Sequence, residues 1–131
     1  NNTVLDNNTG LMWMRYYPIK FGSASNGKMP WYDKLYDIFA YCIAANAASL
    51  GGYTDWRVPN INEYMSLPVQ NGGRGMPDTT AFPSVGNSVT IWSSTTLSNV
   101  TTYGIGYYTA YGIGATWQKT AENYVLLVRG G

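Results

Sequence analysis

Residues 51–63 read Gly-Gly-Tyr-Thr-Asp-Trp-Arg-Val-Pro-Asn-Ile-Asn-Glu, and this segment separates two predicted helices. The paired glycines suit the left-handed backbone that ends a helix. Residues 54–58 predict a short turn and strand that leads into Pro59. Asn60 then caps a second helix, with Glu63 three residues later in a capping-box arrangement. The segment therefore predicts the end of one helix, an extended connection at residues 54–58, and the start of a second, short helix.

A helix is predicted upstream of this segment, from Trp31 to about Ser49. Apolar side chains recur there at spacings of three and four residues, as on the buried face of an amphipathic helix. These positions are Trp31, Leu35, Ile38, Phe39, Cys42 and Ile43. Cys42 is expected to be a buried small hydrophobic residue. In the second helix the expected apolar side is Ile61, Met65 and Leu67, and Pro68 ends the helix.

Strands are predicted on both sides of the helical part. Residues 3–6 and 11–14 are short runs joined by an Asn-Asn-Thr-Gly turn. The stretches 16–30 and 70–88 are rich in Gly and Pro and are predicted to be loops. Further strand-like sequence follows the helices, at 89–95, 100–118 and 123–129. Strands first, helices in the middle and strands last predict an α+β fold with an antiparallel sheet.

The composition fits one compact domain and excludes several kinds of chemistry. The chain has 131 residues, of which 45% are apolar and only 11% are charged. It has no His and a single Cys, so serine-histidine or cysteine-histidine catalysis, His-ligated metal sites and an intrachain disulfide are excluded. The net charge of +1 argues against nucleic-acid binding. We predict no catalytic residues, because no pair of carboxylates has a spacing that calls for acid-base chemistry.

The ends of the chain and its hydropathy bear on its setting. No segment reaches the roughly 18 consecutive apolar residues of a membrane-spanning helix. The chain does not begin with Met. We therefore expect it to be the C-terminal domain of a longer protein, with any targeting sequence lying outside it.

The shortage of charge is concentrated in residues 79–118, which contain no charged residue. Within this segment the tetrapeptide Tyr-Gly-Ile-Gly occurs twice, at 103–106 and 111–114. Odd positions from 103 to 113 carry Tyr, Ile or Thr, whereas even positions carry Gly or Ala, apart from Tyr108. Successive side chains of an extended chain point to opposite faces, so one face is predicted to be bulky and the other nearly bare.

Two interpretations of this alternation remain open. In the first, the bulky face is core and the small face packs closely against another element. In the second, the bulky side chains are displayed to a ligand, and the small residues let the backbone lie against the body of the domain. Tyrosine mixed with Ser, Gly and Asn is the composition of antibody binding loops, where Tyr gives a large contact area at low entropic cost. This composition favours display.

Under the display interpretation, the contact residues are predicted to be Leu97, Asn99, Thr101, Tyr103, Ile105, Tyr107, Tyr108, Tyr111, Ile113 and Thr116. Tyr107 and Tyr111 are the expected anchors, because aromatic residues dominate binding hot spots. The residues expected to belong to the scaffold are Trp92, Trp56, Trp13 and Arg57, with Arg57 and Asp55 forming a structural pair. Trp117 is left open between scaffold and contact surface. No cofactor and no metal ligands are predicted.

Seven short motifs occur in order along the chain. They are residues 6–13, Trp31 with Tyr41-Cys42, residues 51–59, Glu63 with Leu67, Ala81-Phe82-Pro83, Trp92-Ser93-Ser94-Thr95, and Val128-Arg129-Gly130-Gly131. Each motif alone has little specificity. Together and in this order, they resemble the C-terminal domain family of the bacterial collagen-like protein Lcl, over essentially the whole chain.

The resemblance implies a C-type-lectin-like fold over residues 1–131. In that fold the first and last strands pair, two helices flank small antiparallel sheets, and a long loop region supports a second sheet. Proteins with the fold serve as adhesins and as the variable proteins of diversity-generating retroelements. In those variable proteins, adenine-directed mutagenesis randomises codons near the C-terminus. The resemblance also implies an extracellular location, on a prokaryotic cell or a virion.

Two functions remain open at this point. The first is a display module whose diversified, Tyr-rich, uncharged surface binds a protein or another surface molecule. The alternative is an adhesin of fixed specificity that binds glycans without calcium. The chain lacks the Glu-Pro-Asn, Gln-Pro-Asp and Trp-Asn-Asp signatures of calcium-dependent sugar-binding lectins. The eight basic residues are scattered along the sequence, which disfavours a sulfated-glycan site.

Overall fold

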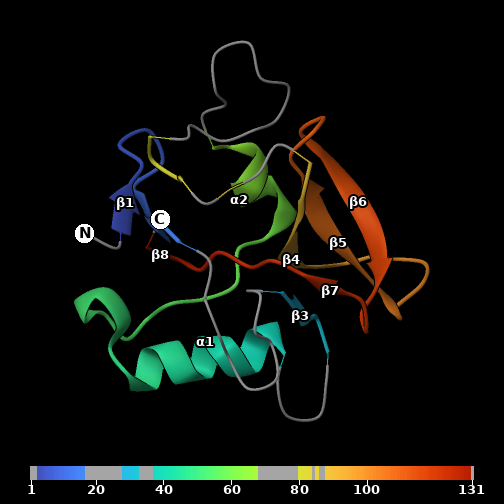
Figure 1. Ribbon diagram of the computed structural model, residues 1–131, viewed down its shortest axis with the longest axis horizontal. Helices are drawn as coiled ribbons and strands as arrows, with labels where there is room; N and C mark the ends of the chain where they lie inside the picture. The colour runs from blue at the N-terminus through green and yellow to red at the C-terminus, as the bar shows by residue number, and fades with distance from the viewer. Residues whose placement is uncertain are drawn as a thin grey trace.

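The computed structural model describes residues 3–16, 28–32, 37–67, 80–83, 85 and 88–130. Its elements are β1 (Thr3–Leu5), β2 (Leu11–Met14), β3 (Met29–Pro30), α1 (Ile38–Ala47), the 3-10 turn η1 (Leu50–Gly52), α2 (Ile61–Met65), β4 (Thr90–Thr96), β5 (Tyr103–Tyr108), β6 (Ile113–Gln118), β7 (Glu122–Asn123) and β8 (Val128–Gly130). Short helices and small antiparallel sheets make a mixed architecture, in agreement with the predicted α+β class (Figure 1). Within the described ranges, neither α-helix combines the length and apolar character that a membrane crossing requires.

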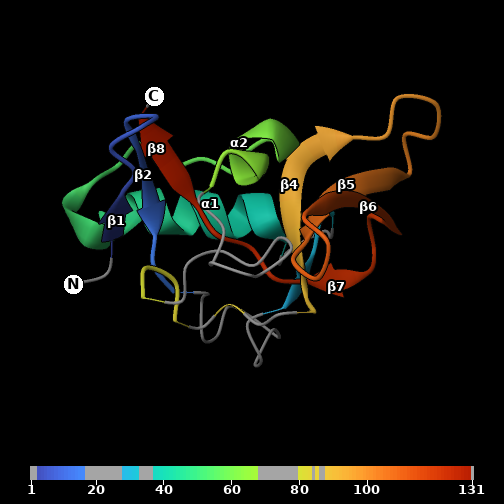
Figure 2. The ribbon, with the colours of Figure 1, turned by 90° about the horizontal axis from the view of Figure 1, so that it is seen from above.

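The first sheet has the order β1-β2-β8, so the first and last strands of the described chain lie on either side of β2 (Figures 1 and 2). Trp13 in β2 pairs with Val4 on one side and with Val128 on the other. The expected pairing of the first and last strands is therefore wrong, because β2 lies between them. The reason is burial: Leu11, Trp13 and Met14 are buried, and such a strand belongs in the centre of a sheet.

The second sheet has the order β4-β5-β6 and lies at the other side of the molecule (Figure 1). The first four residues of β4, from Thr90 to Ser93, are buried, whereas most of β6 is exposed. The sheet is thus anchored in the core by β4 and extends outward through β5 to β6. A two-stranded ladder of β3 and β7 pairs Met29 with Asn123.

The core consists of two clusters separated by the chain segment 125–127. One cluster includes Trp13, Tyr64 and Leu126, and the other includes Trp92 and Leu127. Successive residues of an extended segment point in opposite directions, so Leu126 enters one cluster while its neighbours enter the other. The run Val-Leu-Leu is fully buried for this reason, although only part of the predicted strand 123–129 forms ladder pairs.

Helix α1 is shorter than the predicted helix at both ends. Asp37 is its N-cap, with a side-chain oxygen accepting from the Ala40 N–H at 2.8 Å. Trp31 precedes the helix, so its place in the helical repeat is coincidental. The expected apolar stripe is wrong at Ile43, which is 72% exposed. The prediction that Gly51-Gly52 ends this helix is wrong: the helix ends at Ala47, and the left-handed residue that follows it is Ser49, with φ +51°. Gly51 is also left-handed, with φ +64°, but it lies inside η1.

The capping box of α2 is confirmed. The Asn60 side chain accepts from the Glu63 N–H, and the Glu63 carboxylate accepts from the Asn60 N–H, both at 2.9 Å. Met65 is exposed, and the fully buried position on this helix belongs instead to Tyr64, which the apolar pattern missed. The Tyr64 hydroxyl lies within hydrogen-bond distance of one backbone carbonyl from each core cluster, Trp92 at 2.8 Å and Leu126 at 3.1 Å, so its polar tip is satisfied deep in the molecule. The predicted loops at 16–30 and 70–88 lie largely outside the described residues.

Candidate functional site

The tryptophans assigned to the scaffold are buried as predicted. Trp92 is fully buried, and its indole N–H donates to the Met29 carbonyl at 2.9 Å. Trp56 is 3% exposed and donates to the Leu50 carbonyl at 2.7 Å. Trp13 packs against Tyr64 with ring centroids 5.4 Å apart. These rings fix the two helices and β4 relative to one another.

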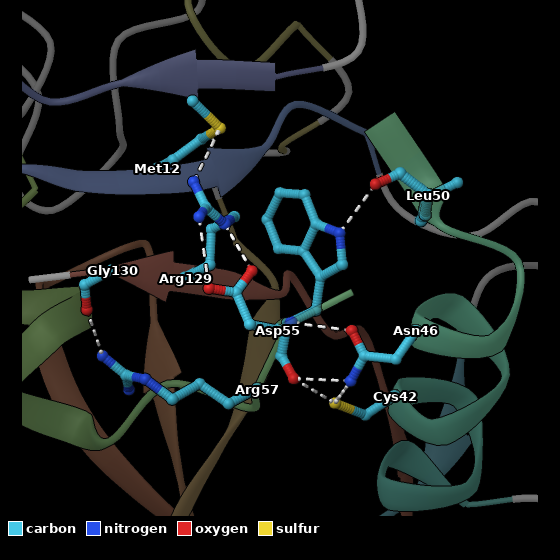
Figure 3. A network of polar contacts seen from close by, with 9 residues as sticks. Met12, Cys42, Asn46, Leu50, Asp55, Arg57, Arg129 and Gly130 are labelled. Atoms are coloured by element: carbon cyan, nitrogen blue, oxygen red, sulfur yellow. Dashed lines mark hydrogen bonds and ion pairs between the residues drawn. The ribbon is translucent and has the colours of Figure 1, made fainter. Parts of the chain in front are cut away.

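The backbone of Trp56 is held by two side chains of α1, Asn46 and Cys42, both of which Figure 3 labels. Asn46 accepts from the Trp56 N–H at 2.7 Å and donates to the Trp56 carbonyl at 2.9 Å. The Cys42 thiol donates to the same carbonyl at 3.1 Å. Burial raises the pKa of Cys42, which keeps it a thiol at neutral pH. Cys42 is thus half-buried and hydrogen-bonded, in place of the purely hydrophobic residue expected.

Two ion pairs connect residues 54–58, the extended segment between the helices, to neighbouring elements. The predicted pair of Arg57 with Asp55 is wrong. Arg57 pairs in bidentate fashion with Glu63, with both distances 2.6 Å. Asp55 instead pairs with Arg129 at 2.6 Å (Figure 3). The Arg129 guanidinium also lies over the Tyr53 ring, 3.8 Å from its centroid. The partners, Arg129 and Glu63, belong to β8 and α2. The sequence alone does not show that these two elements lie next to residues 54–58.

The predicted alternating strand at 100–118 is a hairpin. The chain turns at residues 109–112, where Gly112 has φ +69°, and β6 returns along β5. Tyr107 pairs with Gly114, whereas Tyr108 pairs with Ile113. Directly paired residues share a face of the sheet. The odd positions of β5 therefore lie on the opposite face from the odd positions of β6, and the prediction of one continuous bulky face is wrong.

Tyr107 is buried, so its predicted role as an exposed anchor is wrong. Its side chain is 2% exposed and its ring stacks on Tyr64 with centroids 6.0 Å apart. Burial raises the pKa of its phenol. The odd positions of β5 face α2 and the core, as the first interpretation of the alternation required. Tyr103 and Ile105, on the same face, are half-buried.

The small residues of β5 allow close packing, as both interpretations predicted. A Cβ at Gly104 would lie 3.1 Å from the Trp92 ring and 3.2 Å from the Trp31 ring. A Cβ at Gly106 would collide with the Thr90 side chain. Trp31 is fixed against the sheet by its indole N–H, which donates to the Ser93 carbonyl at 2.8 Å. Glycine in this strand is thus needed for contact between the sheet and Trp31.

The strand pairing places Tyr108, Ile113, Ala115 and Trp117 on one face of the hairpin, which is the face that carries Gly104 and Gly106. Ile113 is 51% exposed and Trp117 is 43% exposed. Tyr111, in the turn, is 54% exposed, and its ring meets the Tyr108 ring edge-on at 5.7 Å. The sequence left Trp117 open between scaffold and surface. Trp117 stands four residues after Ile113, so in a strand that covers both residues their side chains lie on the same face.

The predicted contact residues divide by exposure. Those exposed to solvent are Asn99, Thr101, Tyr111, Ile113 and Thr116. Those half-buried are Leu97, Tyr103, Ile105 and Tyr108. The exposed group lies in β6, in the turn before it and in the loop between β4 and β5. The structure therefore moves the centre of the candidate surface from β5 to β6 and the adjoining loops.

A hollow of about 380 Å³ opens beside the β4–β5 loop and the end of β6. Its lining residues are Trp31, Tyr32, Thr101, Thr102, Gln118, Lys119 and Thr120. The Lys119 ammonium lies 3.9 Å from the centroid of the Trp31 ring. Tyr32 is 62% exposed, and its backbone N–H donates to the Lys119 carbonyl. Sequence reasoning missed the hollow because it placed Trp31 in a helix.

Comparison with known proteins agrees with the resemblance seen in the motifs. The model of the Lcl C-terminal domain family matches residues 2–129. No curated protein and no solved structure matches the chain. The matched residues span every described strand and helix, from β1 into β8. The chain belongs to the Lcl C-terminal domain family.

Proposed function

We propose that this domain is a ligand-binding display module of C-type-lectin-like fold, acting on the outside of a prokaryotic cell or a virion. It binds a protein or another surface molecule and catalyses no reaction. The supporting observation is the outward exposure of large apolar side chains on β6 and in its turn, at Tyr111, Ile113 and Trp117. Exposed apolar groups gathered on one element are typical of an interaction surface.

Burial changes steadily across the sheet, and this supports the division into scaffold and binding surface. The core part of β4 is buried, β5 is mostly covered and β6 is mostly exposed. Substitutions on exposed elements usually change stability by no more than about 0.5 kcal/mol. Affinity then comes from burying aromatic and aliphatic area, at about 25 cal/mol per Å² before entropic costs. Hydroxyl and amide groups of the neighbouring loops supply specificity.

The proposal that this surface is diversified has a test in the coding DNA. We expect a second, nearly identical copy of the 3′ segment, differing only at adenines, near a reverse transcriptase gene. The differing codons should include those for Asn99, Tyr111, Ile113 and Thr116, and should omit those for Trp92 and Tyr107. Absence of such a copy, or differences concentrated at the two buried positions, would count against diversification.

A fixed glycan-binding adhesin is the second candidate, and the hollow beside β6 favours it. Its volume of about 380 Å³ lies within the range of roughly 300–1,000 Å³ for small-ligand sites. Tyr32 offers an exposed ring, and Thr101 and Thr102 offer hydroxyls. On a glycan array in the presence of EDTA, binding lost in Tyr32→Ala and retained in Ile113→Ala would establish the adhesin. Absence of glycan binding leaves the display module as the better account.

A further inference from the structure

Lys119 places one positive charge at the end of the apolar face of β6. Side chains on one face of a strand recur at every second residue, so Lys119 follows Ile113, Ala115 and Trp117 on the same face. The Lys119 N–H donates to the Thr102 carbonyl at 3.0 Å, which continues the pairing of β5 with β6 by one residue. This face therefore presents large apolar groups along the strand and a cation at its end.

The aromatic ring beside Lys119 joins this face to the neighbouring hollow. Gly104 pairs with Trp117, so these two residues lie on the same face of the hairpin. A Cβ at Gly104 would lie 3.2 Å from the Trp31 ring, which places Trp31 over this face next to Trp117. The Lys119 ammonium lies 3.9 Å from the centroid of the same ring, and both residues line the hollow of about 380 Å³. The apolar face of β6 and the hollow therefore adjoin each other at Lys119.

The backbone around Lys119 is fixed on both sides of the residue. Its N–H is bonded to Thr102, and its carbonyl accepts from the Tyr32 N–H at 3.0 Å. The turn that follows is closed by the Ala121 N–H, which donates to the Gln118 carbonyl at 2.9 Å. These bonds and the cation–π contact hold the ammonium at the hollow before a ligand binds, which lowers the entropic cost of binding.

The charge of Lys119 is available to a ligand. Among the described residues, Lys119 takes part in neither of the two ion pairs. Residues 79–118 carry no charge, so β4, β5 and β6 supply no second cation to this surface. A polyanion needs several cations, whereas one carboxylate needs only one. The chemistry complementary to this surface is therefore a single carboxylate beside apolar groups.

We propose that the partner of this surface is a protein that places one Asp or Glu side chain against Lys119 and apolar side chains against Ile113 and Trp117. This inference rests on the proposed display function and names the chemistry of its ligand. The carboxylate accepts from the ammonium in a charge-assisted hydrogen bond while the ammonium stays over Trp31. Apolar contact supplies affinity, and the charge selects partners, because a basic side chain at the same place is repelled.

Selection from a phage library of random peptides tests this chemistry directly. The immobilised wild-type domain should enrich peptides that carry Asp or Glu next to aromatic or aliphatic residues. Lys119→Glu should enrich Lys or Arg instead, because the sign of the charge is reversed. Lys119→Met keeps an apolar stem over Trp31 and removes the charge, so its peptides should show no charge preference. Equal acid content in the wild-type and Lys119→Met selections overturns the proposal.

Single peptides from the wild-type selection separate this inference from the display function. Such a peptide should bind Lys119→Met about tenfold more weakly than the wild type and should bind Lys119→Arg nearly as well. Trp117→Ala should also weaken it, because the apolar contact is lost. Binding that falls in Trp117→Ala but not in Lys119→Met leaves the display function standing and overturns the acidic partner. Unfolding midpoints of the same variants exclude loss of the fold as the cause.

Hyaluronan tests the other class of ligand that carries carboxylates, an acidic glycan. It has no apolar side chains to meet Ile113 and Trp117, so calorimetry should detect no binding to the wild type. Hyaluronan binding that is present in the wild type and lost in Lys119→Met would assign the cation to an acidic glycan. That result overturns the protein partner.

Discussion

At the scale of single residues, the same residue type has opposite roles in this domain according to its strand position. Tyr107 and Tyr111 stand four residues apart in the uncharged segment and were indistinguishable by composition. One ring stacks on Tyr64 in the core, and the other is 54% exposed. The turn at 109–112 causes the difference, because it ends the face that β5 presents to α2.

Alanine substitutions should separate these two tyrosines. We expect Tyr107→Ala to lower the free energy of unfolding by about 3–5 kcal/mol, as for other large buried aromatic residues. Tyr111→Ala should change it by no more than about 0.5 kcal/mol, as for most surface positions. Urea unfolding followed by tryptophan fluorescence measures both. Equal losses in the two variants would mean that the exposed turn also carries core packing.

Glycine at 104 illustrates how a packing requirement can be hidden in a sequence. Its position in a repeated Tyr-Gly-Ile-Gly motif predicted a small face, and the structure confirms close contact there. What the sequence could not identify was the contacting residue, Trp31, which lies far away in the chain. The sequence pattern thus predicts that residue 104 must be small, but it does not predict which side chain packs against it.

At the scale of elements, local signals were reliable and signals that depend on tertiary contact were not. The capping box of α2 was predictable because Asn60 and Glu63 complete it between themselves. The start of α1 was not, because Trp31 fits the helical period but is held by Ser93 in a strand of the second sheet. Likewise, the hairpin was hidden because the alternation of large and small residues continues through its turn.

The capping box and its ion pair predict a dependence of stability on pH. Arg57 holds the pKa of the Glu63 carboxyl below its ordinary value of 4.5, with help from the Asn60 N–H. A carboxyl whose folded pKa is lowered stabilises the native state fully above its unfolded pKa, and this contribution is lost as the pH falls through the folded pKa. Stability should therefore decline below about pH 4.5 as Glu63 becomes protonated.

Glu63→Gln isolates this contribution. Gln keeps an acceptor for the Asn60 N–H but carries no charge for Arg57, so the variant should be less stable at neutral pH. Its stability should also fall less between about pH 5 and about pH 3 than that of the wild type. Thermal unfolding at a series of pH values gives both quantities. An unchanged acid slope would assign the loss to other carboxyls, such as Asp55, whose pKa Arg129 also lowers.

At the scale of the whole molecule, the fold class followed from the order of the elements, but the sheet arrangement did not. Strands at both ends and helices between them were visible in the sequence. The central place of β2 depends on which strand has paired neighbours on both edges, and the sequences of three such short strands do not show this. The family followed from seven motifs in order, because the family pattern extends over the whole chain. The exact contact surface did not follow, because exposure is set by tertiary packing.

A scaffold that supports display should tolerate several surface changes at once. We expect the fivefold alanine variant at Asn99, Thr101, Tyr111, Ile113 and Thr116 to fold with a Tm within about 5 °C of the wild type, because each exposed change costs little. A single Trp92→Ala change should cost more, about 3–5 kcal/mol, because that ring is fully buried. Calorimetry on the two variants compares them directly. If the fivefold variant were the less stable one, the hairpin would be structural, and β6 could not be the variable part of a binding surface.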